Sequence, residues 1–144
     1  METFSELETE KLGRSLAAKL RPGDVVLLYG ELGAGKTAFA RGVARGLGVQ
    51  GPVASPTFTL LRMYEAAAPL RHFDLYRLAG EDDFFAAGLE EHLGGDVVAL
   101  VEWPERCEGA LPKARLEVRV AYGEAENERR ITITPAGGFR EVVL

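Results

Sequence analysis

The glycine-rich segment at residues 30–37, GELGAGKT, constrains this chain more than any other stretch. A glycine followed by four residues and then Gly-Lys-Thr has the spacing of a loop that wraps nucleotide phosphates. Gly33 and Gly35 let the backbone turn sharply and bring its N–H groups close to phosphate oxygens. Lys36 is expected to reach the β- and γ-phosphates, and the Thr37 hydroxyl is expected to ligate the Mg²⁺ that bridges them. The predicted nucleotide-binding residues of the loop are Glu31, Leu32, Gly33, Ala34, Gly35, Lys36 and Thr37.

The segments on either side of this loop have the patterns that a phosphate loop requires. Residues 24–29 form an apolar run of strand length, typical of a strand buried on both faces. After the loop, Phe39, Val43 and Leu47 recur every four residues, which indicates one face of a helix that stops at Gly48. That helix would direct the positive end of its dipole at the bound phosphates. The alternative, a glycine-rich turn without a ligand, is therefore disfavoured.

The beginning of the chain predicts a helix that leads into the strand before the loop. Ser5 and Glu8 have capping-box spacing, with the serine placed to accept from the first turn and the glutamate placed to reach back. Leu12, Leu16 and Leu20 then share one face. Packing is the default role of this helix. Because the helix precedes the nucleotide strand, its start is also a candidate to approach the base or ribose.

Length and composition limit the classes of protein. The chain has 144 residues, enough for one packed core and too few for two, so residues 1–144 are predicted to form one domain. No apolar run approaches the roughly 18 residues of a membrane helix, and the first residues are acidic and polar, unlike a secretory signal. We therefore expect a cytoplasmic protein without membrane contact. The single cysteine, Cys107, excludes an internal disulfide. A net charge of −5 argues against a protein that grips nucleic acid unaided.

Residues 51–58, GPVASPTF, are a candidate switch segment. Two prolines and small hydroxyl residues exclude a regular helix, so we expect a loop that enters a strand. In nucleotide hydrolases a threonine in such a loop senses the γ-phosphate and its metal, which makes Thr57, with Ser55, a switch candidate. The alternative is a plain turn whose hydroxyls bond their own backbone.

A predicted hairpin brings the first candidate carboxylate. Residues 57–65 and 70–76 are β-prone runs separated by Ala-Ala-Ala-Pro. Asp74 lies near the expected end of the second strand, where a carboxylate can hold the Mg²⁺ shell or orient the attacking water. A structural aspartate paired with an arginine is the alternative. His72 is expected to be packed or hydrogen-bonded and not a metal ligand, because His92 has no metal-site spacing to it.

The second candidate carboxylate ends the apolar run at residues 96–102. This run has the Walker-B form, which predicts a strand beside the phosphate-loop strand. From there Glu102 reaches the metal or the hydrolytic water. Trp103 follows at once and is either a core residue or a residue beside the γ-phosphate. A short helix is expected from Glu81, and the alternating patterns at 115–120 and 130–134 predict two half-exposed strands that extend or cap the sheet.

These motifs in combination resemble a known family. The phosphate loop, SPTF at 55–58, HFDLYRL at 72–78 and VEWPER at 101–106 are similar in order and spacing to the bacterial TsaE family, also called YjeE, small ATPases of the tRNA threonylcarbamoyladenosine (t6A) pathway. The resemblance implies an α/β, P-loop NTPase-like, three-layer domain with a mixed central β-sheet. It also implies ATP and Mg²⁺ as cofactors, and hydrolysis that is slow for the isolated protein.

The resemblance further implies partners and residue roles. The partners would be the TsaD and TsaB subunits that transfer threonylcarbamoyl to tRNA, so that tRNA meets this chain at most indirectly. Ser55 and Thr57 fall in the switch segment of the family, Asp74 in HFDLYRL, and Glu102 with Trp103 in its acid-Trp motif. The implied catalytic residues are Asp74, Glu102 and Thr57, the metal residues are Thr37, Glu102 and Asp74, and Ser55 and Trp103 join the loop in binding nucleotide. We favour Glu102 for the metal and Asp74 for the water or the second shell.

Other functions stay open beside this one. A small-molecule kinase also begins with a phosphate loop, but it needs an acceptor pocket and usually a lid, whereas the residues after Glu102 are predicted to be strands. A GTPase is disfavoured because no Asn-Lys-x-Asp stretch is present. A nucleotide-gated binding module, in which the bound state and not the turnover docks a partner, lies closest to the ATPase hypothesis.

Overall fold

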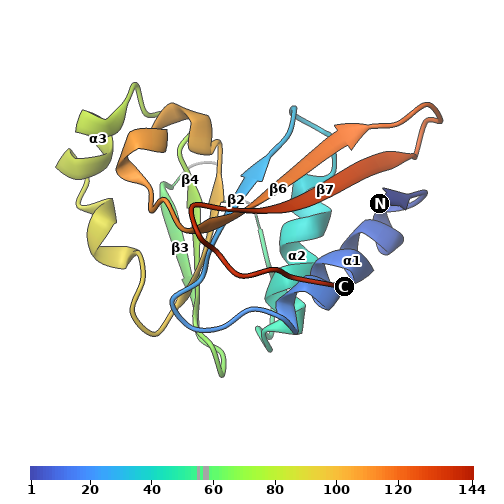
Figure 1. The fold of residues 1–144 in the computed structure, drawn as a ribbon, viewed down its shortest axis with the longest axis horizontal. Helices are drawn as coiled ribbons and strands as arrows, with labels where there is room; N and C mark the ends of the chain where they lie inside the picture. The colour runs from blue at the N-terminus through green and yellow to red at the C-terminus, as the bar shows by residue number, and fades with distance from the viewer. Residues whose placement is uncertain (55, 57–58) are drawn as a thin grey trace.

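The computed structural model describes residues 1–54, 56 and 59–144, so the switch candidates Ser55 and Thr57 lie outside the described residues. A seven-stranded mixed sheet with the strand order β1-β7-β6-β2-β5-β4-β3 forms the middle of the described chain (Figure 1). Its strands are β1 (Glu2–Thr3), β2 (Val25–Tyr29), β3 (Leu61–Tyr64), β4 (Leu70–Asp74), β5 (Val98–Glu102), β6 (Arg115–Tyr122) and β7 (Arg129–Ala136). The helices are α1 (Glu6–Ala17), α2 (Lys36–Gly46) and α3 (Glu81–Ala86), with 3-10 turns η1 (Leu89–His92), η2 (Pro104–Arg106) and η3 (Glu108–Ala110).

The four central strands, β4, β5, β2 and β6, run parallel to one another. Every residue of β2 and of β5 is buried, as expected for parallel strands whose two faces are both covered. The strand predicted beside the phosphate-loop strand is confirmed, because β5 pairs with β2 from Val25↔Ala99 to Leu28↔Glu102. The carboxyl ends of these strands therefore meet at one edge of the sheet.

Antiparallel strands complete both sides of the sheet. The predicted hairpin is confirmed as β3 and β4, although its strands are shorter than the β-prone runs. The two alternating segments at the end of the chain form the hairpin β6–β7, which extends the sheet next to β2. The strand β1 was not expected from the sequence; it pairs with β7 through Glu2↔Arg130 and Thr3↔Arg129.

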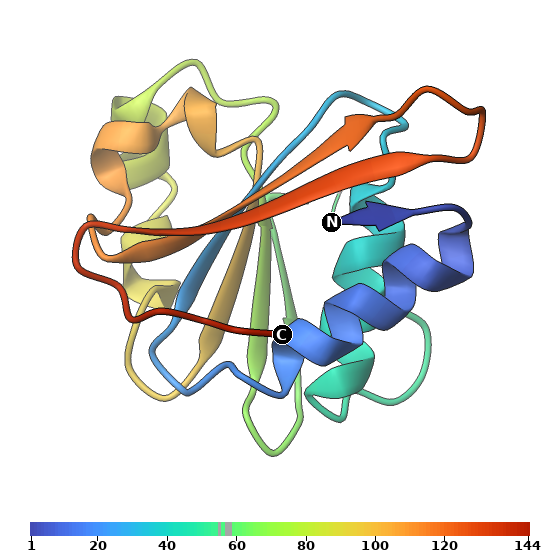
Figure 2. The same cartoon turned by 45° about the vertical axis from the view of Figure 1, so that its right-hand side comes forward.

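Helices cover both faces of the sheet (Figure 2). On one face, α1 and α2 pack together over Val26 and Leu28 of β2. On the other face, α3 and the 3-10 turns cover the alternate residues of β2, Val25 and Leu27, together with Phe73. Alternation along β2 thus contributes to two separate hydrophobic clusters, one on each face. Among the described helices, none is both long and apolar enough to cross a membrane.

Candidate functional site

A cavity of about 590 Å³ lies at the edge where β2, β4 and β5 end. The loop between β2 and α2 borders it, because the chain leaves β2 at this edge and returns over it as α2. Five of the seven loop residues predicted to bind nucleotide line the cavity: Leu32, Gly33, Gly35, Lys36 and Thr37. The three other predicted side chains of the described site, Asp74, Glu102 and Trp103, line it as well. The structure therefore brings together predicted residues that lie as far apart in the chain as Leu32 and Trp103.

The conformation of the loop depends on its glycines. Gly33 and Gly35 have φ angles of 80° and 106°, in the left-handed region that other residues rarely adopt. Gly35 is also the N-cap of α2, and no side chain in the described chain caps the helix there. The first N–H groups of α2 are therefore left for another acceptor at the rim of the cavity. An anion is the acceptor that such a helix start favours.

Lys36 brings a buried ammonium group to this cavity. The residue is only 6% exposed, and its Nζ has no hydrogen-bond partner within the described residues. The nitrogen lies 4.0 Å from the centre of the Trp103 ring, an arrangement in which the ring face attracts the cation. Burial lowers the pKa of Lys36, while the carboxylates of Glu102, Glu105 and Asp74 oppose that shift. A buried ammonium group without a hydrogen-bonded acceptor fits a site that an anionic ligand completes.

Two carboxylates face the lysine from neighbouring strands. Asp74 of β4 and Glu102 of β5 are direct partners in the parallel register, and they are 8% and 4% exposed. One oxygen of Asp74 accepts a hydrogen bond of 3.0 Å from the backbone N–H of Tyr76. Burial raises the pKa of Asp74, and the charge of Glu102 adds to the rise, although the Tyr76 N–H, His72 and Lys36 lower it. Two close carboxylates are an arrangement that a cation would stabilise.

His72 extends this cluster into the sheet. Its Nε2 lies 2.7 Å from Oε2 of Glu102, and both side chains are buried. The expectation that His72 is packed or hydrogen-bonded is confirmed. Its pairing with Glu102 was not predicted, because that contact depends on the register between β4 and β5.

A metal at this site would need ligands from outside the protein. No group of three or more histidine, cysteine, aspartate or glutamate side chains able to hold a metal was found in the parts of the chain described here. Mg²⁺ commonly binds to one or two carboxylates and takes its other oxygens from water and substrate phosphates. Asp74, Glu102 and the hydroxyl of Thr37, which all line the cavity, fit that kind of site.

Trp103 occupies the wall between this cavity and a second one. Its φ angle of 55° is in the left-handed region, which is unusual for a residue with a large side chain. The Trp103 ring lies 4.9 Å from the ring of Tyr76, measured between centres. Trp103 also lines a second cavity of about 570 Å³. The Trp103 residue therefore borders both cavities.

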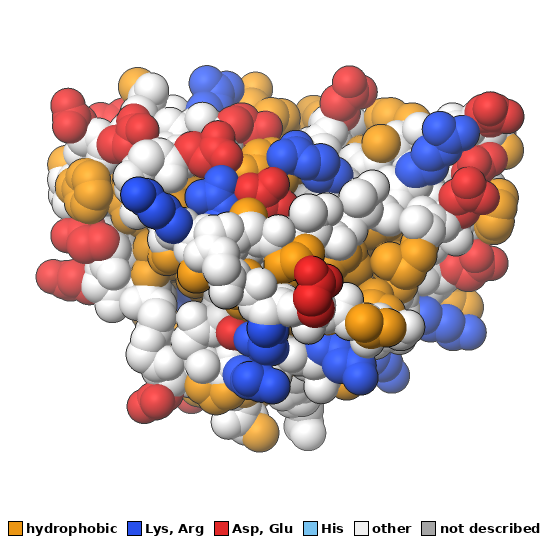
Figure 3. Space-filling view, viewed as in Figure 1, with side chains coloured by type: hydrophobic (Ala, Val, Ile, Leu, Met, Phe, Trp, Pro, Cys, Tyr) orange, Lys and Arg blue, Asp and Glu red, His pale blue; other side chains and the backbone are white. Residues whose placement is uncertain are grey.

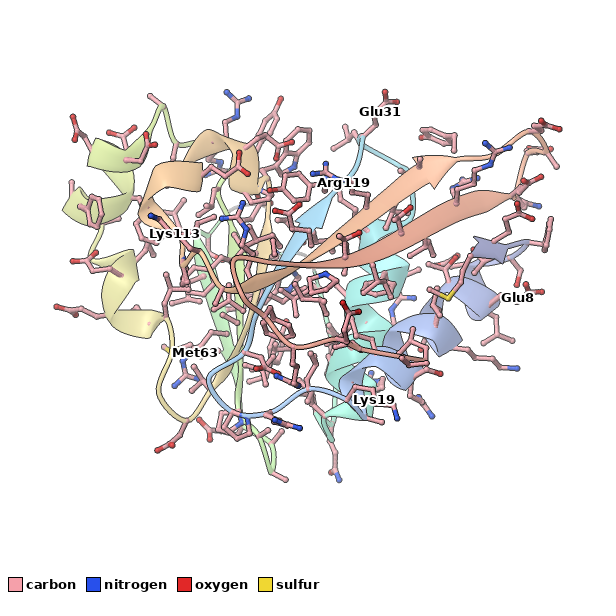
Figure 4. The ribbon with its side chains drawn as sticks, viewed as in Figure 1. Glu8, Lys19, Glu31, Met63, Lys113 and Arg119 are labelled. Atoms are coloured by element: carbon pink, nitrogen blue, oxygen red, sulfur yellow. The ribbon has the colours of Figure 1, made fainter. Side chains whose placement is uncertain are left out.

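Two predicted loop residues lie away from the first cavity. Glu31 lines the second cavity, together with Arg119 of β6, and Figure 4 shows its side chain at the outer end of the loop that follows β2. Ala34 is fully buried in the core, and its N–H donates to the carbonyl of Glu31 within the loop. The side chains of these residues do not line the cavity that contains Lys36.

Several residues of the cavity were missed from the sequence. Tyr76 lies two residues after Asp74 in the HFDLYRL motif but was not predicted as a site residue. Asn127 and Arg129 come from the turn end of the hairpin β6–β7, where nothing in the local pattern indicates a site. The start of α1 lines the cavity too, through Ser5, Glu6 and Thr9, and its approach to a base or ribose stays a prediction. Ser5 accepts a hydrogen bond from the N–H of Glu8, as the capping box predicts. The Glu8 carboxylate reaches back to the N–H of Phe4, one residue before the cap.

These features define an α/β protein that places a glycine-rich loop, a buried lysine and two buried carboxylates at the carboxyl edge of its parallel strands. The model of the family described as "Threonylcarbamoyl adenosine biosynthesis protein TsaE" matches residues 3–131. The chain belongs to the TsaE family, as its motifs indicate.

Individual relatives agree with this family. A Bacillus subtilis protein named tRNA threonylcarbamoyladenosine biosynthesis protein TsaE is 42% identical over 142 residues, covering 98% of this chain and 88% of the relative. A Streptomyces coelicolor protein of the same name is 45% identical over 134 residues, covering 88% and 90% of the two chains. The crystal structure of Bacillus subtilis YdiB superposes with a TM-score of 0.81 at 37% identity, covering 96% of this chain and 84% of that one.

Proposed function

We propose that this chain is a Mg²⁺-dependent ATPase with a P-loop NTPase-like fold that acts in the biosynthesis of t6A in tRNA. The observation that carries the proposal is the buried ammonium group of Lys36, which has no hydrogen-bond partner among the described residues and lies in a cavity bordered by the glycine-rich loop. The names of the curated relatives supply the pathway. The chemistry follows from the residues around the cavity.

The loop and the helix start would bind the triphosphate. Backbone N–H groups of the loop and of the first turn of α2 would donate to the phosphates, and the dipole of α2 would favour their negative charge. Lys36 would pair with the β- and γ-phosphates and so gain the partner that it lacks among the described residues. The pocket at the start of α1 and at Asn127 would receive the nucleoside end.

The two carboxylates would have different roles, one in binding the metal and one in aligning the attacking water. Thr37 and Glu102 would hold Mg²⁺, which when bound neutralises charge on the phosphate oxygens. Asp74 would accept a hydrogen bond from the attacking water and align it with the γ-phosphorus. The new bond joins this water oxygen to phosphorus, the bond to the β-phosphate oxygen breaks, and ADP and inorganic phosphate leave. Trp103 would lie beside the γ-phosphate, because its ring already lies against the Nζ of Lys36.

The proposed ATP hydrolysis would serve a complex of partner proteins. We place the chain in the cytoplasm as a subunit that joins TsaD and TsaB and supports repeated turnover of their transfer reaction. Direct contact with tRNA is not part of the proposal, because the net charge is −5. Figure 3 shows basic and acidic side chains interspersed over the viewed face, without a large area of one sign there.

A nucleotide-gated binding module is the second candidate, and the position of Trp103 favours it. Trp103 contacts Lys36 in the first cavity and borders the second. A ligand that pairs with Lys36 would therefore change the surroundings of a side chain in both cavities. A small-molecule kinase has less support: after Glu102 the described chain forms only short 3-10 turns and the hairpin β6–β7, with no helical lid.

The proposal is tested by measuring binding and turnover separately. Lys36→Ala should weaken ATP binding about 100-fold, because a charge-assisted contact to the phosphates is lost, and calorimetry with Mg²⁺·ATP measures this loss. Glu102→Gln keeps the size of the side chain and should lower kcat about 100-fold with little change in ATP affinity. An unchanged ATP affinity in Lys36→Ala would contradict the proposal that this cavity binds the phosphates. A Glu102→Gln chain that binds ATP and fully supports the TsaD and TsaB complex would favour gating over hydrolysis.

A further inference from the structure

His72 is a buried polar residue in the middle of the sheet. It is 1% exposed, in the middle of β4, between the fully buried Leu70 and the site residue Asp74 on the same face of the strand. Its Nδ1 is buried and has no hydrogen-bond partner in the described part of the chain. Burying a polar ring nitrogen without a partner costs free energy that an apolar side chain would not cost. Packing alone therefore does not explain an imidazole at this position.

The other ring nitrogen gives the explanation. Nε2 of His72 lies 2.7 Å from Oε2 of Glu102, a short distance for a hydrogen bond to a carboxylate. Against the carboxylate form of Glu102, Nε2 is assigned as the donor, because two lone pairs facing each other at that distance would repel. The imidazole thus donates to one chosen oxygen of the glutamate.

The two carboxylates of the site are held in the same way. His72 holds Oε2 of Glu102, and the N–H of Tyr76 holds Oδ1 of Asp74. No residue described here forms a hydrogen bond with the second oxygen of either group. Among the described residues, each carboxylate therefore has one oxygen held by a hydrogen bond and one oxygen without such a bond, and both residues line the cavity. Fixing one oxygen also fixes the rotation of the carboxylate, and with it the direction of the other.

We propose that His72 is a positioning residue, which orients Glu102 through the hydrogen bond from Nε2 so that the second glutamate oxygen is held ready for Mg²⁺ or for the water near it. This inference rests on the proposed function of the site. Residues that orient a metal-binding group typically contribute 10- to 100-fold to metal affinity or activity. The sequence motif contains His72 two residues before Asp74, but its partner is 30 residues further along the chain.

Two amide variants test the hydrogen bond with little change in polarity. In His72→Gln the amide nitrogen reaches approximately the position of Nε2, whereas in His72→Asn it reaches only the position of Nδ1. His72→Gln should keep kcat within about threefold of the wild-type value, while His72→Asn should lose about 10- to 100-fold. Leu70→Ala is the matched control, because it disturbs the same face of β4 without touching Glu102, and its kcat should stay near that of the wild type.

A second measurement detects Mg²⁺ binding in the absence of ATP hydrolysis. Trp103 is the only tryptophan of the chain and is adjacent to Glu102, so its fluorescence can report Mg²⁺ titrated into the ADP-loaded protein. His72→Asn should need about 10- to 100-fold more Mg²⁺ for the half-maximal change, with the affinity for ADP in EDTA unchanged. Equal Mg²⁺ dependence in the Asn and Gln variants would overturn the proposal. So would a loss in Leu70→Ala as large as that in His72→Asn.

The wild-type protein gives a test that does not depend on the folding of variants. The proton on Nε2 of His72 should give a downfield NMR resonance that shifts when Mg²⁺ is added to the ADP-loaded protein, and a resonance that does not shift would contradict the inference. If the wild-type chain neither binds nor hydrolyses ATP, the proposed function itself fails. If it does both and the two amide variants behave alike, only the role of His72 fails.

Discussion

Single residues of the site carry charge at a cost to the stability of the protein. Lys36 and Asp74 are both buried, and burial is the largest cause of the shift in both of their pKa values, downward for the lysine and upward for the aspartate. Each shift means that folding disfavours the charged form of that group. Ionisable groups whose charged form is disfavoured by burial are typical of functional sites.

Asp74→Asn should therefore stabilise the ligand-free protein while it lowers turnover. Because burial raises the pKa of Asp74 above its ordinary value of 3.8, the folded state binds more protons than the unfolded state between those two values. Stability is consequently lost as the pH rises through this window. The asparagine variant keeps an oxygen for the N–H of Tyr76 and avoids the loss.

Urea unfolding of both proteins at a series of pH values measures this difference. The variant should be the more stable protein at pH 7, and its advantage should disappear as the pH falls toward 3.8. A variant that is less stable at pH 7 would show that the ionised Asp74 is stabilised by its surroundings in the absence of ligand.

At the scale of elements, the sequence predicted those helices and strands that depend on residues close together in the chain. The strand β2, the helix α2 and the cap of α1 at Ser5 follow from apolar runs, four-residue spacing and capping chemistry. The strand β1 could not be predicted, because its two residues form a strand only by pairing with β7, far along the chain. The close contact between α1 and α2 also has no local signal apart from a glycine within a helical pattern.

Gly42 of α2 tests that contact. A Cβ at this position would meet the backbone carbonyl of Glu10 in α1, so an alanine would force the two helices apart. Gly42→Ala should lower the free energy of unfolding by about 1–3 kcal/mol, although alanine favours a helix over glycine. Chemical denaturation measures the change.

Gly80→Ala is the control for this prediction. Gly80 precedes α3 with an extended backbone, and a Cβ there meets nothing within 4 Å. The free energy of unfolding of Gly80→Ala should fall by less than about 1 kcal/mol, which is the scale of a changed N-cap. If the two variants were equally stable, the close approach of α1 and α2 would not be the reason why position 42 requires a glycine.

At the scale of the whole molecule, the site combines motifs with contacts that only the fold creates. The loop and the two carboxylates were predictable, because their chemistry requires particular residues at the ends of strands. The hydrogen bond from His72 to Glu102 and the contribution of Arg129 depend on strand register and on the path of the hairpin β6–β7. The roles of Ser55 and Thr57 stay predictions, since both lie outside the described residues.

The sharing of Trp103 between two cavities also belongs to this scale. It connects the cavity that contains Lys36 with a face on which Glu31 and Arg119 lie (Figure 4). An ATPase that acts within a larger assembly requires some connection of this kind. A change of ATP turnover on addition of a partner is therefore the property that the proposed function most specifically predicts.

The release of inorganic phosphate from ATP in the presence of Mg²⁺ measures that property most directly. The purified chain should hydrolyse ATP slowly by itself and faster when TsaD and TsaB are added, and the Lys36→Ala chain should show neither activity. Stimulation that depends on an intact Lys36 would support a partner-coupled ATPase. Equal rates with and without the partners would leave a nucleotide site but contradict the proposed place of its activity, and no phosphate release under either condition would contradict the ATPase itself.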